Sequence, residues 1–175
     1  MNVINLLEKK SFIKYLPFFL IVLSISISST IFPPKGYAMT IPFIPIICII
    51  FWSLLIGKNL NIFQYFLIGI YTDLLLGTPL GSYLLIFSIL RYLSIKVKAR
   101  FQIDNFFKNI IAAFILIIIF FILSNLFFMI YYGKLIFSKY LILNILATIF
   151  LYPALAVVFL WIYKITSIEK YYVEA

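Results

Sequence analysis

The sequence predicts an all-α integral membrane protein: a bundle of six transmembrane helices with the N- and C-termini in the cytoplasm. Of the 175 residues, 66% are hydrophobic and only 11% are charged, and the mean hydropathy is +1.20. This composition lies far outside the range of soluble domains. A bilayer core about 30 Å thick requires about 20 apolar residues per helix, so six spans and short turns use almost the whole chain. We therefore expect one transmembrane domain over residues 1–175.

Apolar stretches between short polar breaks define the individual spans. Pro33, Pro34 and Gly36 end the first stretch, since proline lacks the amide hydrogen that a helix needs. A cleaved signal peptide is the alternative for this stretch, but no A-x-A pattern closes it. Pro42 and Pro45 suit a first turn or a kink, which leaves the start of the second span open. The predicted spans are 15–33, 40–56, 60–76, 80–96, 109–132 and 140–163.

The distribution of lysine and arginine sets the predicted orientation. Short cytoplasmic loops carry the excess of these residues. With the N-terminus inside, 11 of the 14 basic residues fall on the cytoplasmic side and 3 fall outside. The inner set is Lys9, Lys10, Lys14, Lys58, Arg91, Lys96, Lys98, Arg100, Lys108, Lys164 and Lys170; the outer set is Lys35, Lys134 and Lys139. One span more or fewer would remove this asymmetry.

The residue types present argue against an enzyme and against a bound cofactor or metal. The chain has no histidine, which excludes imidazole base chemistry and most zinc sites. Its single cysteine, Cys48, lies in an apolar run and has no cysteine partner. The spans hold no second carboxylate to share a proton, and the chain has no glycine-rich phosphate loop.

Polar residues in the last two spans have a simpler explanation than substrate binding. Ser124 and Asn125 lie in the fifth span, and Asn144 and Thr148 lie in the sixth. Side chains of these types form hydrogen bonds between helices in a bilayer, each contributing about 0.6 kcal/mol. We expect them to pack the bundle.

Asp73 is the only acidic residue inside a predicted span, where an aspartate costs about 2.5 to 3.5 kcal/mol. Gly69 and Gly77 lie one turn before and after it, so the three residues share a helix face that another helix can approach closely. One interpretation places Asp73 in interfacial water at the start of a loop. The other makes it a carboxylate that organises helices or binds a partner. It would then be held by a hydroxyl such as that of Thr72 or Thr78, by backbone amides, or by a cation.

Arg91 is the only basic residue well inside a span and therefore the first candidate for that cation. Counted from the 77–81 turn, it lies several residues deeper than Asp73. At 1.5 Å per residue this offset strains a direct pair. We expect Arg91 to extend toward the cytoplasmic surface instead.

The stretch from Gly69 to Gly81, GIYTDLLLGTPLG, resembles the signature of the MreD family of rod shape-determining proteins, in which a spanning helix ends in D-x-x-x-G-x-P-L-G. The chain's length and hydropathy pattern are similar too. The resemblance implies a non-enzymatic subunit of the cell-elongation machinery in the bacterial inner membrane. Its partners would be an MreC-like bitopic protein, the RodA glycan polymerase, a penicillin-binding transpeptidase and, indirectly, MreB filaments. The residues expected to dock partners are Gly69, Asp73, Gly77, Pro79, Leu80 and Gly81.

Two other functions remain open from the sequence. The S component of an energy-coupling-factor vitamin transporter is also a small six-helix bundle with basic inner loops. It would need polar groups converging on a ligand near the outer face, and the predicted outer loops carry few. The third candidate is a structural subunit of another membrane complex.

Overall fold

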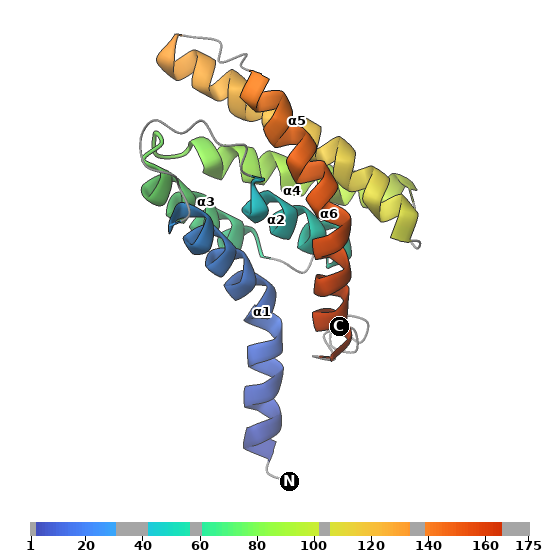
Figure 1. Ribbon diagram of the computed structural model, residues 1–175. Coiled ribbons are helices and arrows are strands. Elements are labelled where there is room, and N and C mark those ends of the chain that lie inside the picture. Colours follow the sequence, from blue (N-terminus) through green and yellow to red (C-terminus); the bar gives the residue numbers. More distant parts are fainter. Residues whose placement is uncertain (1–2, 31–41, 57–60, 102–105, 134–138, 166–175) are drawn as a thin grey trace.

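The computed structural model describes residues 3–30, 42–56, 61–101, 106–133 and 139–165 (Figure 1). These residues form six α-helices and no strand. The helices follow the predicted order. They are α1 Val3–Thr30, α2 Ile44–Leu55, α3 Ile62–Leu76, α4 Ser82–Phe101, α5 Phe106–Tyr132 and α6 Lys139–Ile165.

Some helix ends differ from the predicted spans because of the proline and glycine residues near them. α2 begins at Ile44, with Pro45 in its first turn, where the missing amide hydrogen costs nothing. α4 begins at Ser82 instead of residue 80, because Gly81 has a φ of 99° and does not continue a helix. It then runs through Lys98 and Arg100 into its last turn, beyond the predicted end at residue 96.

The short helix α2 is the centre of the bundle. It packs against α1, α4, α5 and α6, and every residue from Pro45 to Leu54 is buried. A helix that is apolar all round is stable only when other helices cover it. Figure 1 shows α2 enclosed in this way, with the start of α1 and the end of α6 at the same end of the molecule.

Aromatic rings fill the space beside α2. Phe43 and Phe120 stack with ring centroids 5.5 Å apart, and the ring of Phe87 lies 6.4 Å from that of Phe120. Such separations are those of favourable aromatic pairs. The rings join α4 and α5 to the segment that leads into α2.

Hydrogen bonds between helices involve only some of the polar residues expected to make them. The hydroxyl of Thr148 on α6 accepts a bond from the backbone N–H of Phe43, 3.2 Å away. Tyr152 donates to the Asn109 side chain of α5 at 2.9 Å. Ser124 and Asn125 donate instead to carbonyls one turn back in their own helix, as side chains of these types often do.

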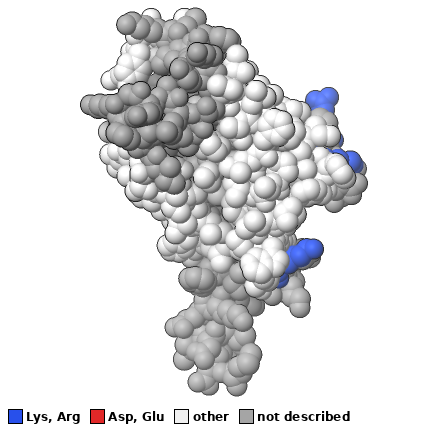
Figure 2. All heavy atoms as spheres, viewed as in Figure 1, with Lys and Arg blue, Asp and Glu red and all other residues white. Residues whose placement is uncertain are grey.

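The exposed surface is largely apolar. α5 and the part of α6 from Leu141 to Ile165 are long and apolar enough to cross a bilayer, with mean hydropathies of 3.0 and 2.4 over an 18-residue window in each. Tyr15–Thr30 of α1, α2 and α3 are apolar but shorter. Figure 2 shows the lysine and arginine side chains of this face along one edge, the side where Figure 1 places the start of α5. A large apolar surface with charges at one end is typical of a protein embedded in lipid.

Candidate functional site at the turn between α3 and α4

A glycine turn ends α3. Gly77 has a φ of 65°, in the left-handed region, and its N–H donates to the carbonyl of Asp73. The N–H of Thr78 donates to the same carbonyl at 3.1 Å. This pattern closes the last turn of a helix and satisfies its free carbonyls, and glycine adopts the required φ without strain.

The start of α4 lacks a capping side chain of its own. Gly81 precedes the first helical residue and its carbonyl accepts the N–H of Leu85 at 3.0 Å. An N-cap residue normally uses a side-chain oxygen to accept one of the unpaired amides of the first turn. Glycine has none, so another group must accept them.

The Asp73 carboxylate of α3 fills this role for α4. Its Oδ2 accepts the N–H of Gly81 at 2.8 Å, and its Oδ1 accepts the N–H of Tyr83 at 3.0 Å. The Thr78 hydroxyl also donates to Oδ1 at 2.7 Å. The Ser82 hydroxyl shares its single hydrogen between Oδ1, at 2.9 Å, and the carbonyl of Pro79, at 2.8 Å. Asp73 is 1% exposed. Four donors and the positive end of the α4 dipole together stabilise a charge that burial alone would disfavour.

This geometry decides how Asp73 is held. The interpretation that it only reaches interfacial water is wrong, because its side chain is enclosed. Thr78 and backbone amides hold it, whereas the Thr72 hydroxyl donates to the carbonyl of Ile68 in its own helix. Arg91 lies eight residues beyond Tyr83 along α4, about 12 Å along the helix axis.

Gly69 has a different role from the one expected. A Cβ atom at this position would lie 2.4 Å from the Cα of Leu84, so the backbones of α3 and α4 touch here. The face that Gly69 shares with Asp73 is therefore covered by α4 of the same chain. The expectation that this face is open to a partner helix is corrected: its small residue lets the α3–α4 hairpin close.

The remaining motif residues lie at the surface. A Cβ at Gly77 would have no atom within 4 Å, and Leu80 is 74% exposed. Pro79, Leu80 and Gly81 line one end of an apolar groove of about 420 Å³. Its other walls are residues 82–86 of α4 and, on α5, Phe127, Phe128, Ile130 and Tyr131. We call this the α4–α5 groove.

The α5 wall of the groove could not be identified from the sequence. Phe127, Phe128 and Tyr131 look like ordinary residues of an apolar span. Only the packing of α4 against α5, which run in opposite directions in Figure 1, places them opposite the motif. Tyr83, which is buried and donates its N–H to Asp73, also lies just outside the recognised motif.

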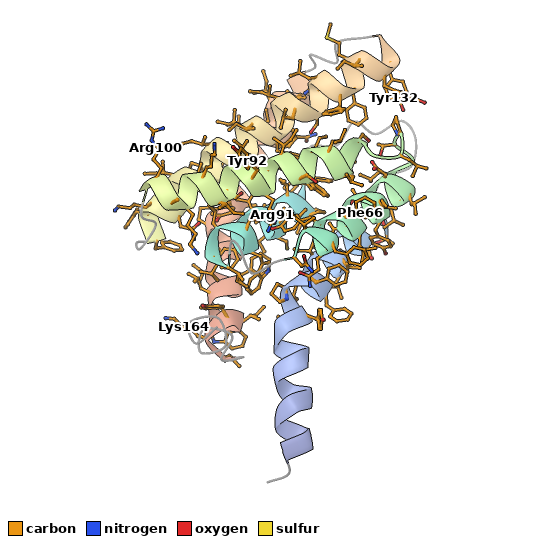
Figure 3. All side chains as sticks on the ribbon, turned by 180° about the vertical axis from the view of Figure 1, so that it is seen from behind. Phe66, Arg91, Tyr92, Arg100, Tyr132 and Lys164 are labelled. Atoms are coloured by element: carbon orange, nitrogen blue, oxygen red, sulfur yellow. The ribbon has the colours of Figure 1, made fainter. Side chains whose placement is uncertain are left out.

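Basic residues hold the middle and the C-terminal end of α4. The guanidinium carbon of Arg91 lies 5.6 Å from the ring centroid of Tyr65 on α3, and the Tyr65 hydroxyl is hydrogen-bonded to that of Ser53 on α2. Figure 3 shows Arg91 directed into the bundle, which differs from the expected extension toward the surface. Lys98 donates to the carbonyl of Leu55, at the C-terminus of α2, at 2.7 Å. A cation at this position satisfies a free carbonyl and complements the helix dipole.

The fold and the site together define a helical protein with a largely apolar surface. Its buried carboxylate, Asp73, joins two helices of the same chain. Among the residues that the structure describes, no group of side chains has the composition of a metal centre. The chain belongs to the MreD family: the family model of the rod shape-determining protein MreD matches residues 9–163, which include the whole motif. It is thus a rod shape-determining membrane protein. Comparisons with curated proteins and with solved structures give no match.

Proposed function

We propose that this protein is a non-enzymatic subunit of the bacterial cell-elongation complex, and that it scaffolds peptidoglycan synthesis through helix–helix docking. The partners are an MreC-like bitopic protein, the RodA glycan polymerase and its penicillin-binding transpeptidase, with MreB filaments linked indirectly. Family membership supports the cellular role. The absence of histidine and the use of Asp73 as a fully bonded cap support a structural role, because catalysis needs a group free to accept or donate a proton.

We further propose that all six helices cross the inner membrane, with both termini in the cytoplasm. The described basic side chains belong to the inner set of the sequence assignment, and those visible in Figure 2 lie along one edge, which supports this topology. The start of α1 and the end of α6 lie at one end of the molecule, which agrees with an even number of spans. In this orientation the 77–81 turn and the α4–α5 groove face the periplasmic side.

The α4–α5 groove is the observation that carries the docking proposal. It is a concave apolar surface, and Leu80 projects beside it with 74% of its surface exposed. The bonds to Asp73 fix the backbone at Gly81 and Tyr83, so the groove wall is ordered before a partner arrives. An interface that is already ordered loses less entropy on binding. An apolar pocket with a projecting anchor is also a common centre of protein interfaces.

A pair of leucine variants tests the docking surface. Leu80 lines the groove, while Leu74 on α3 is similarly exposed, at 65%, but lies outside it. Gly77 is a poor site for this test because its positive φ would strain any side chain placed there. The full chain is tagged at the C-terminus and purified gently from native membranes, and the MreC-like protein and the wall synthases are quantified.

We expect Leu80→Asn to lower recovery of the MreC-like protein about tenfold, as for a central interface residue, and Leu74→Asn to leave it unchanged. Both variants should reach the membrane at wild-type levels. Equal recovery with Leu80→Asn and wild type would reject the groove as the docking surface. Recovery of none of the elongation proteins with the wild-type chain would reject the proposed function itself.

A further inference from the structure

Three exposed basic side chains lie where α4 ends and α5 begins. Lys96 and Arg100 are one turn apart on α4, and Lys108 lies in the first turn of α5. The ammonium group of Lys96 lies 4.5 Å from the ring centroid of Tyr92, one turn earlier on the same side of α4. Figure 3 shows Tyr92 and Arg100 along α4, with Arg100 at its end. We call Lys96, Arg100 and Lys108 the α4–α5 basic rim.

An apolar slot begins at this rim. It has a volume of about 110 Å³ and is lined by Lys108, Ile111, Ala112 and Ile115. These residues are spaced i, i+3, i+4 and i+7, so they form one stripe along α5 that is about 10 Å long. Ala112 is 3% exposed and forms the floor, while Ile111 and Ile115 are exposed walls. The slot therefore leads from a positive charge into the apolar part of the helix surface.

We propose that the slot and the basic rim bind one anionic phospholipid. The phosphate of the headgroup pairs with Lys108, and Lys96 and Arg100 add positive potential. An acyl chain lies along the stripe between Ile111 and Ile115. Charge complementarity and the direction of the slot select this occupant, because only an amphiphile with an anionic head matches a cation at the mouth and apolar walls below it.

Lys164 provides the comparison that separates this site from general surface charge. It is an exposed lysine in the last turn of α6, and Figure 3 shows it apart from Arg100. It does not line the slot. A lysine that only sets topology attracts anionic lipid through its charge alone, so Lys108 and Lys164 would then contribute alike. If Lys108 belongs to a specific lipid site, its replacement should weaken lipid binding more than replacement of Lys164.

Native mass spectrometry of the full chain, delipidated in detergent, measures the binding directly. Phosphatidylglycerol and phosphatidylcholine with identical acyl chains are titrated into wild type, Lys108→Gln, Lys108→Arg and Lys164→Gln. We expect wild type to retain one phosphatidylglycerol in preference to phosphatidylcholine. Lys108→Gln should weaken its binding about fivefold, whereas Lys108→Arg and Lys164→Gln should keep it.

Three results would overturn the proposal. Equal retention of the two lipids would show that headgroup charge does not select the lipid. Equal losses of binding in Lys108→Gln and Lys164→Gln would show that the lipid responds only to the general positive potential of the surface. Millimolar inorganic phosphate tests the part played by the acyl chain. We expect the lipid to stay bound in its presence, and displacement would show that the rim binds only a phosphate group.

Discussion

The two ends of α4 are held by side chains of opposite charge. The residues in contact are close in the sequence at one end and far apart at the other. At its N-terminus, the Asp73 carboxylate accepts four hydrogen bonds from donors that lie five to ten residues away in the chain. At the other end, Lys98 reaches a carbonyl 43 residues away, and Arg91, in the middle of the helix, lies over the ring of Tyr65. The first site closes a hairpin within one stretch of sequence. The second joins α4 to α2 and α3 only once the bundle is assembled.

The polar contacts at the two ends of α4 differ in how tightly they are enclosed. At the N-terminal end of α4 the Asp73 carboxylate is enclosed and its hydrogen bonds fix the backbone beside the α4–α5 groove. The C-terminal end uses long, half-buried side chains that tolerate adjustment. Substitutions at the first site should therefore cost more stability than substitutions at the second.

Removal of the Asp73 carboxylate is expected to have the largest effect. Asp73→Ala leaves the N–H groups of Gly81 and Tyr83 without their acceptor at the start of α4, which should cost about 2 to 4 kcal/mol. Unfolding by denaturing detergent, followed by circular dichroism, measures the loss. Asp73→Asn keeps one acceptor oxygen and should lose less. A wild-type unfolding curve for Asp73→Ala would contradict the capping role.

Disruption of the close contact between α3 and α4 at Gly69 should have the next largest effect on stability. The added methyl of Gly69→Ala would meet the backbone of Leu84 at 2.4 Å, so α3 and α4 must separate, at a cost of about 1 to 3 kcal/mol. The same unfolding experiment applies. Ser88→Ala, at an exposed position of α4, serves as the control and should be close to neutral. Greater stability in Gly69→Ala would show that the contact relaxes easily.

Loss of the Lys98 bond should have the smallest effect of the three. Lys98→Met keeps most of the apolar stem but removes the donor to Leu55, and one cation at a helix C-terminus contributes about 0.3 to 1 kcal/mol. Lys164→Met controls for the loss of a positive charge. If Lys98→Met destabilised the protein more than Asp73→Ala, the proposed difference between the two ends of α4 would be reversed.

Much of the fold could be predicted because it depends on local chemistry. Hydropathy and proline or glycine breaks predicted the number and order of the helices, and the 77–81 turn follows from glycines at positive φ. The importance of Asp73 also followed from local information, since an isolated carboxylate in an apolar span needs partners.

Contacts between helices could not be predicted in the same way. The small-residue face of Gly69 is equally compatible with a partner helix and with α4, and only the folded chain shows Leu84 against it. The direction of Arg91 depends on Tyr65 and Ser53 from two other helices. Hydropathy carries no information on which helices are neighbours, so the α5 wall of the groove was missed for the same reason.

Photo-crosslinking in native membranes tests the central claim most directly. A photoreactive amino acid is placed at Leu80, beside the groove, or at Leu74, outside it, and the adducts are identified by mass spectrometry. The account predicts an adduct with an MreC-like protein or a wall synthase from position 80 and none from position 74. Adducts with these proteins from position 74 alone, or equally from both positions, would contradict it.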